Sequence, residues 1–493
     1  MSVLKIMAFF LAVLVISFVS FYLLYFNVYA NAQLETAIDS TTSYEAVTSV
    51  NDAILKTLII ISQVAMLGII FNYFFFSRIL HKKRDNILYG SKKNNIYFDI
   101  RTLKRVASIA IICCISIVIF STGSILLQSY QLTQNLDLDI YVAFDISYAS
   151  SIGQVWIIRV VTSAAIIGVM LTFYIVNRKR KKTSHMKSEN LGNESLNKIS
   201  FTNNKANHLL LLIVIVLSSV NLFSNSMISH SNSLPSLPTF TVFMDLIHFM
   251  AVSIWIGGLF YLSLIIVKDL NPITYIDTLN TTNTISGVSN SMMGVHSISI
   301  TLMYFSFAVI IALGIIGITG LYLGYMHLQD LDSIFNTQYG QILMLKLALA
   351  FPLIFIGRYN QLKIYEYASI ISNLLNDKSK NIDENNYLHQ RYHKKRTALF
   401  RALNRSLKIE SLLAIAVLIM ASFLSVTSPP SLEAIGQHLL TMHDNNNLGE
   451  SKDSLFFLLL IMALAVMISA IGIVNFRKNQ KQIKTVLAIS NGN

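Results

Sequence analysis

Long apolar runs alternate with polar segments along the chain. Ten such runs begin near residues 6, 54, 104, 153, 208, 242, 300, 340, 406 and 455. Each is long enough for a transmembrane helix, which needs about 20 residues to cross the hydrocarbon core. The pattern therefore predicts an all-α fold: a polytopic transmembrane bundle of about ten helices, with no soluble domain large enough to act by itself.

The first run, from Ile6 to Tyr29, is open to two interpretations. Ala30-Asn31-Ala32 resembles the cleavage site of a signal peptide, whose apolar core has roughly 7–15 residues. Because this run is longer than that, we expect a retained transmembrane helix, and cleavage is the alternative.

Basic residues gather on one side of the predicted membrane. The formal net charge is +13, and 34 of the 38 Lys and Arg residues lie before the first run or after the second, fourth, sixth, eighth and tenth runs. This asymmetry predicts that these segments and both termini face the cytoplasm. Because 54% of the residues are hydrophobic and only 13% are charged, the expected partner of the positive charge is the lipid bilayer of the cytoplasmic membrane, and no nucleic acid is expected.

Short motifs recur with a shift of four helices. Thr122-Gly123 corresponds to Thr319-Gly320, and Gly153-Gln154 followed by Arg159 corresponds to Gly340-Gln341 followed by Lys346. Because a shift of four helices keeps the direction through the membrane, the pattern predicts a parallel repeat of four-helix halves. We divide the chain into an N-terminal helix (residues 1–30), a first membrane half with basic cytoplasmic loops (31–207, helices 2–4), a core (208–430, helices 5–9), and an outer loop with helix 10 (431–493).

Several classes of function lack their motifs. The chain has no P-loop pattern, no Asp-Lys-Thr-Gly phosphorylation motif and no serine nucleophile elbow. Its only cysteines, Cys113 and Cys114, are adjacent, so they predict neither a disulfide framework nor a zinc site. We expect them to be buried core thiols, with a soft-metal contact as the alternative, and we expect neither an enzyme nor an ATP-driven pump.

The run near residue 242 carries the residues best suited to chemistry. Asp245 and His248 lie three residues apart near its predicted outer end, on one helical face with Met244 beside them. Carboxylate, imidazole and thioether groups together suit a soft or borderline cation such as copper. Ionisable groups inside a membrane helix are usually functional or paired. The alternative is that His248 bonds Asp245 or a carbonyl group and pins helices together.

More potential metal ligands lie on the same predicted side of the membrane, namely His230, His327, His438 and His443. The outer segments contain carboxylates but almost no cations, so we expect little repulsion of a metal ion there. Glycines line one side of the helix near residue 300 and would let another backbone approach closely: Gly314, Gly317, Gly320 and Gly324. Lys346 is expected to extend outward from its helix, and Glu410 and Arg358 are expected to pair near the inner surface.

These segments together resemble the copper resistance protein D (CopD) family of integral membrane proteins. They follow the order of the family: Asp245-x-x-His248 with Trp255-x-Gly257-Gly258, Tyr304-Phe-Ser306 before Thr319-Gly320, Tyr339-Gly340 before Lys346, and Glu410 in a helix that ends at Pro429-Pro430. The stretch Ser151-Ile-Gly153-Gln154-x-Trp156-x-x-Arg159 is similar to an upstream part of the family. By this resemblance the core at 208–430 is CopD-like, and structural or gating roles belong to Trp255, Gly257, Gly258, Gly320, Lys346 and Glu410. Arg358 has such a role as the expected partner of Glu410.

The resemblance implies about eight core helices that handle copper, often alongside a small extracytoplasmic copper-binding protein, CopC. The outer segments of this chain are too short to contain a CopC domain, so such a partner would be a separate protein. The resulting hypothesis is copper uptake through His248, Asp245 and Met244, helped by the other outer histidines. The alternatives are a non-catalytic structural or assembly subunit of a larger membrane complex, and a haem or electron-transfer membrane protein, which needs two axial ligands on facing helices.

Overall fold

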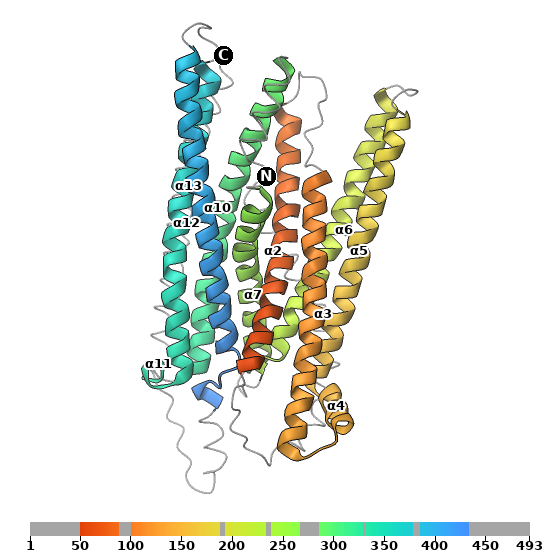
Figure 1. Cartoon of the computed structure of the whole chain (residues 1–493), viewed down its shortest axis with the longest axis vertical. Helices are drawn as coiled ribbons and strands as arrows, with labels where there is room; N and C mark the ends of the chain where they lie inside the picture. Colours follow the sequence, from red (N-terminus) through yellow and green to blue (C-terminus); the bar gives the residue numbers. More distant parts are fainter. Residues whose placement is uncertain are drawn as a thin grey trace.

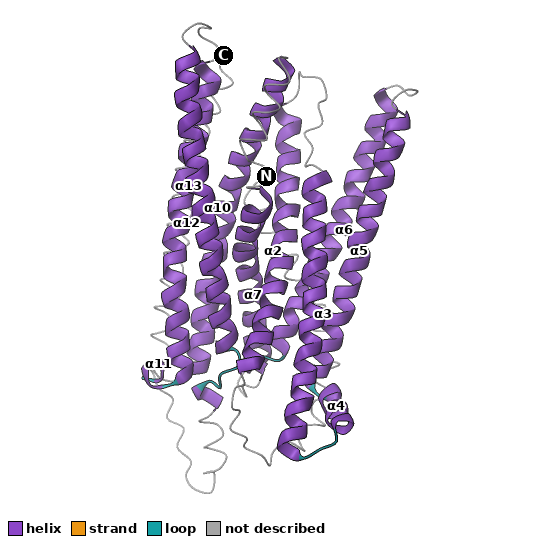
Figure 2. Cartoon of the chain, viewed as in Figure 1, coloured by secondary structure: helices purple, strands orange, loops and turns teal. Residues whose placement is uncertain are grey.

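The computed structural model describes residues 50–87, 100–187, 193–232, 238–266, 285–328, 332–377 and 385–432. Every regular element in these residues is helical, as Figure 2 shows. Eight of the described helices are long and apolar enough to cross a membrane. The predicted all-α membrane bundle is therefore confirmed, while the helices expected near residues 6 and 455 lie outside the described residues.

The eight long helices form two groups of four in chain order. The first four are α2 (Val50–Ile87), α3 (Ile100–Leu136), α5 (Ser151–Lys187) and α6 (Asn193–Met227). The second four are α7 (Pro238–Tyr261), which continues into the π-helical turn η2 (Leu262–Ile266), α10 (Ile285–Leu328), α12 (Gln338–Asp377) and α13 (Asn385–Leu424). The short helices are α4 (Ile140–Ala149), η1 (His230–Asn232) and α11 (Ser333–Asn336). Because α4 and α11 lie at the same end of the bundle (Figure 1), we call this end the α4/α11 end.

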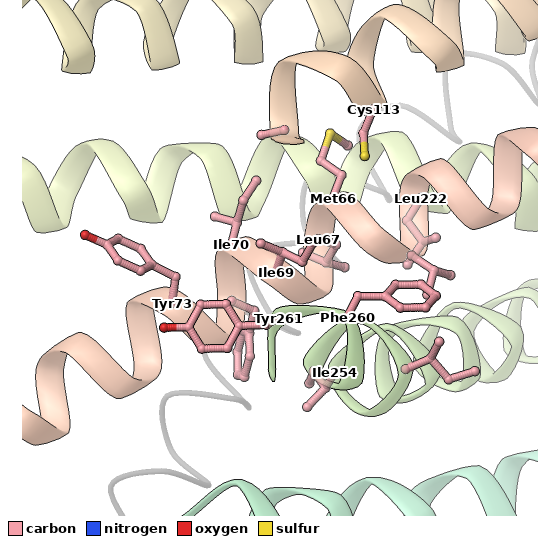
Figure 3. Close-up of a cluster of buried hydrophobic side chains, with 14 of the residues drawn as sticks. Met66, Leu67, Ile69, Ile70, Tyr73, Cys113, Leu222, Ile254, Phe260 and Tyr261 are labelled. Carbon is pink, nitrogen blue, oxygen red and sulfur yellow. The ribbon is translucent and has the colours of Figure 1, made fainter. Parts of the chain in front are cut away.

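Helices α2 and α7 occupy the centre of the bundle, while α5 with α6 and α12 with α13 flank it on opposite sides (Figure 1). In the most apolar stretch of each helix, 67% of residues are buried in α2 and 78% in α7, against 11% in α12. An apolar helix that remains exposed in this way is stable in lipid but not in water. The labelled core residues in Figure 3 accordingly come from α2, α3, α6 and α7, and include Met66, Leu222 and Tyr261.

The backbones of α2 and α7 touch at two glycines. A Cβ atom on Gly68 would collide with the carbonyl oxygen of Ser253 and the Cα of Gly257. A Cβ atom on Gly257 would collide with the carbonyl oxygen of Val64 and the Cα of Gly68. Ser253 lies four residues before Gly257, and Val64 lies four residues before Gly68. The two helices therefore contribute equivalent surfaces to the contact, as two copies do across a twofold axis.

The contacts between helices repeat from the first four helices to the second four. The pairs α2–α3, α3–α5 and α5–α6 are in contact, and so are the corresponding pairs α7–α10, α10–α12 and α12–α13. Helix α6 contacts α7 as α13 contacts α2. The matched glycines Gly153 and Gly340 each lie against carbonyl groups of the segment just before their helix, those of Tyr148 and of Ser333 and Ile334. These observations support the predicted parallel repeat, with α2 equivalent to α7.

Candidate metal site at the α4/α11 end

Asp245 lies in the second turn of α7, close to the α4/α11 end. It is buried, with 8% of its surface exposed, and it lies beside Ser226 and Ser229 at the end of α6. Its Oδ2 atom has no hydrogen-bond partner. Because an unsatisfied polar group costs several kcal/mol in hydrocarbon, this oxygen is a candidate acceptor for a cation.

His248 is held against α10, not against Asp245. Its Nδ1 atom lies 2.9 Å from Oγ1 of Thr319, and the Thr319 hydroxyl donates to the carbonyl of Ile315 at 2.7 Å. With its own proton on the Ile315 carbonyl, the Thr319 hydroxyl accepts from the Nδ1–H of His248, and in this tautomer Nε2 carries the lone pair. Gly320 gives the ring room, because a Cβ there would lie 3.3 Å from Cε1 of His248.

The predicted glycine seam of α10 is wrong in part, because Gly317 and Gly324 have no atom within 4 Å of an added Cβ. Only Gly320 among these three faces a neighbouring side chain, and that side chain is His248. A helix can approach another backbone at a glycine only where the glycine points at it. At Gly320, the close approach is to the imidazole ring of His248.

We expect Gly320→Ala to lower the free energy of unfolding by about 1 kcal/mol, because the added methyl group presses on the His248 ring. The matched change Gly324→Ala should be neutral or stabilise the protein by about 0.5–1 kcal/mol, since alanine favours a helix interior. Thermal unfolding of the two purified variants provides the comparison. Equal stabilisation by both changes would show that His248 does not rest on Gly320.

His230 and His327 lie side by side at the same end. His230 begins η1 and His327 is in the last turn of α10, with ring centroids 6.5 Å apart and ring planes at 78°. Nε2 of His230 and Nδ1 of His327 are buried without hydrogen-bond partners. The ring of Tyr339, at the start of α12, lies 6.1 Å from that of His327.

The surroundings of His230 favour a neutral ring. Burial is the main cause, and the nearby charges of Lys56 and His327 add to it, so the pKa of His230 falls to about 4. A hydrogen bond to the backbone of Thr427 acts in the opposite direction but is weaker. At neutral pH the ring is therefore neutral, which is the protonation state in which histidine binds metals.

Two lysines lie close to these groups, although the outer segments contain almost no cations. Lys346, two turns into α12, is near enough for its charge to act on Asp245 and His248. Lys56, near the start of α2, acts on Asp245 and His230, and its Nζ atom donates to the carbonyl of Ser425 at 2.9 Å. The sequence missed this because both lysines lie within apolar runs and not in the outer segments.

The predicted ligands do not form one chelating group in the described part of the chain. Nowhere in these residues do three His, Cys, Asp or Glu side chains lie close enough to hold one metal ion. Met244 is half-buried, and His438 and His443 lie outside the described residues. The metal-binding roles of all seven predicted ligands stay predictions, but the geometry separates a pair of histidines from Asp245 and His248.

The predicted ion pair between Glu410 and Arg358 is wrong. Glu410 is buried on α13, and its Oε2 accepts a hydrogen bond from Nδ2 of Asn360 on α12. Its Oε1 lies against Gly357, where an added Cβ would be 3.2 Å away. Arg358 is exposed, because one residue's rotation along a helix of 3.6 residues per turn places it on another face from Gly357.

The remaining predicted structural residues are at helix contacts. Trp255 is buried in the core, and Gly257 is at the crossing of α2 and α7 described above. Gly258 lies against the Phe305 ring and the Asn72 side chain, so an added Cβ would collide with both. Asn72 also donates to the carbonyl of Ile254 at 3.1 Å. These positions are consistent with a structural role.

A buried polar network in the first four helices was not predicted. Arg159 donates from Nε to Ser224 and from Nη2 to Asn225, both at 2.8 Å. Asn221 donates to Thr162 at 2.7 Å, and Gln63 of α2 donates to Asn221 at 2.8 Å. The available signal was the spacing of Asn221, Ser224 and Asn225, which places all three on one face of a membrane helix.

The fold and its buried polar groups define a polytopic α-helical membrane protein with histidine and carboxylate groups at one end. The family model of copper resistance protein D matches residues 299–424, which cover most of α10 and all of α11, α12 and α13. The predicted resemblance to the CopD family of membrane proteins is thus confirmed by this match. Asp245, His248 and His230 lie before the matched segment. No curated protein and no solved structure was found to match the chain.

Proposed function

We propose that this protein carries copper across the cytoplasmic membrane, accepting it at the α4/α11 end. By the predicted topology this end faces outward, because the basic segments lie at the opposite ends of the helices. The observation that carries the proposal is the group of buried atoms without partners at this end, Oδ2 of Asp245, Nε2 of His230 and Nδ1 of His327. Copper is the metal that the family match suggests for them.

Asp245 and His248 would act after the ion has been captured. Asp245 offers a negative charge in a region that otherwise contains Lys56 and Lys346, so it reduces the electrostatic cost of a cation there. His248 offers its Nε2 atom one turn further along α7, held in position by Thr319. Because the ligands are spread along α7 instead of gathered at one point, each holds the ion weakly, which transport requires.

The source of the copper would be a separate extracytoplasmic copper-binding protein of the CopC type. The described connections at the α4/α11 end consist of short helices and turns, so they would offer a docking surface and not a further metal-binding domain. Membrane potential would favour inward movement of a cation, at about 2.3 kcal/mol per charge for each 100 mV.

We expect reconstituted protein to admit Cu(I) into liposomes that contain a Cu(I)-sensitive fluorescent chelator. Asp245→Asn should slow the uptake at least about tenfold, corresponding to about 1.4 kcal/mol of lost stabilisation of the cation. Asp145→Asn is the matched control, because Asp145 is exposed on α4, and it should leave the rate unchanged. If wild-type protein admits no more copper than empty liposomes do, the transport proposal fails and an assembly role gains support.

A further inference from the structure

The pair formed by His230 and His327 has two features of a metal site before any metal is considered. Each ring keeps one nitrogen buried and without a hydrogen-bond partner, although an unpaired buried polar atom is costly. His327 is only 6% exposed, so water has little access to its free nitrogen. The two residues come from separate elements, η1 and α10, which pack at the α4/α11 end.

The spacing of the two rings fits one shared ion. A metal ion lies about 2 Å from an imidazole nitrogen, and that nitrogen lies roughly 1 Å from the centre of its own ring. Two rings on opposite sides of one ion therefore have centres roughly 6 Å apart. The observed separation of 6.5 Å is close to this value, so the two rings are near enough to share one ion.

The surroundings of His230 also match those of a metal ligand. Its ring is hydrogen-bonded to the backbone of Thr427, and since Nε2 has no partner, the bonded nitrogen is Nδ1. Metal-binding histidines usually donate their second nitrogen to a carbonyl or carboxylate, which fixes the ring and directs the lone pair at the metal. Thr427, just beyond α13, would play this orienting part.

The number of ligands at the pair determines which metal ion suits the site. No third His, Cys, Asp or Glu of the described residues joins this pair to form a metal-binding group. Zn²⁺ in a structural site needs four ligands, and Cu²⁺ prefers a tetragonal arrangement, whereas Cu(I) and Ag(I) are stable with two ligands in a line. Charge also favours a monovalent ion over a divalent one, because the cost of burying an ion grows with the square of its charge. The nearby positive charge of Lys56 repels a divalent ion more strongly than a monovalent one.

We propose that His230 and His327 together hold one Cu(I) ion in a two-coordinate site, the first site that copper occupies at the α4/α11 end. This inference rests on the proposed transport function and specifies its substrate as a monovalent soft cation. Asp245 and His248 would then receive the ion from the pair. The orienting bond to Thr427 couples the pair to α13, and Tyr339 packs against His327 at the start of α12.

The test measures Cu(I) binding to the detergent-purified full chain, with Ag(I) as a stand-in that does not change oxidation state. At one equivalent, X-ray absorption should show two nitrogen neighbours at about 2 Å and no sulfur. His230→Ala and His327→Ala should each weaken binding more than the roughly 10–100-fold caused by loss of an outer-shell partner. His208→Ala is the matched control, since His208 begins the membrane-spanning part of α6, at the end far from His230. Zn²⁺ should not displace the bound ion.

Three results would overturn the two-histidine site. The first is a spectrum with sulfur or with three or more ligands at one equivalent; this measurement on wild-type protein decides even if a histidine variant does not fold. The second is unchanged Cu(I) affinity in both folded histidine variants. The third is a Soret band in the purified protein, which would assign the pair to haem. If wild-type protein transports Cu(I) in spite of one of these results, only the site is wrong; if it neither binds nor transports copper, the transport proposal fails as well.

Discussion

Gly68→Ala should prevent stable packing of the bundle, with a loss of at least about 3 kcal/mol in the free energy of unfolding. The obstacles that the new methyl group meets are the Ser253 carbonyl oxygen and the Gly257 Cα. Backbone atoms of a central helix cannot change rotamer, so the two helices would have to separate along their whole contact. That separation would open the core that α2 and α7 share.

Gly168→Ala is the matched control for this change. Gly168 is exposed on α5, and an added Cβ there meets no atom within 4 Å. This variant should be neutral or slightly more stable, because glycine in a helix interior costs about 0.5–1 kcal/mol relative to alanine. The measurement is the thermal unfolding midpoint of both variants purified in the same detergent. Similar midpoints for Gly68→Ala and Gly168→Ala would contradict the direct backbone contact between α2 and α7.

Two residues of opposite charge occupy equivalent positions relative to the crossing of α2 and α7. Lys56 lies twelve residues before Gly68 in α2, and Asp245 lies twelve residues before Gly257 in α7. The two residues therefore occupy equivalent positions in the repeat, and they are close enough for their charges to interact. One half offers a carboxylate where the other offers an ammonium group, so under the proposed function only the second half would bind a cation.

The helices and their arrangement in a repeat could be predicted from the sequence because the membrane imposes strong patterns on it. A helix that crosses lipid must be long and apolar, and the equal spacing of Gly153 to Arg159 and of Gly340 to Lys346 predicts the repeat. The expected contacts of the glycines were less reliable. A glycine can lie against a backbone, as Gly257 does, against a side chain, as Gly320 does, or against nothing within 4 Å, as Gly317 does.

Partners of buried polar groups could not be predicted, because they depend on how helices far apart in sequence are rotated about their axes. Glu410 bonds Asn360, although Arg358 is only two residues away and carries the opposite charge. Likewise, the sequence predicted that His230 and His327 lie on the same side of the membrane, but not that their rings are neighbours. The spacing of residues along one helix predicts which side chains share a face. The packing of the helices determines which residues that face contacts.

Neutral side chains surround the buried guanidinium group of Arg159. Asn225 accepts from Nη2 of Arg159 at 2.8 Å and donates to Oε1 of Gln63. In the described residues no carboxylate is paired with this guanidinium, so neutral oxygen atoms of Asn225 and Ser224 stabilise a buried charge. Asn225→Leu should therefore lower the free energy of unfolding by about 3–5 kcal/mol, the usual cost of leaving a buried charge without its partner.

The double variant Arg159→Met with Asn225→Leu should be more stable than Asn225→Leu alone, although it lacks more hydrogen bonds. Removing both partners replaces a buried charge and its acceptor with apolar groups, which is often nearly neutral, whereas removing one partner leaves the other unsatisfied. Unfolding of the two single variants and the double variant in detergent forms a complete cycle. If the double variant is the less stable one, Arg159 has another partner that holds its charge, and the network is not what stabilises it.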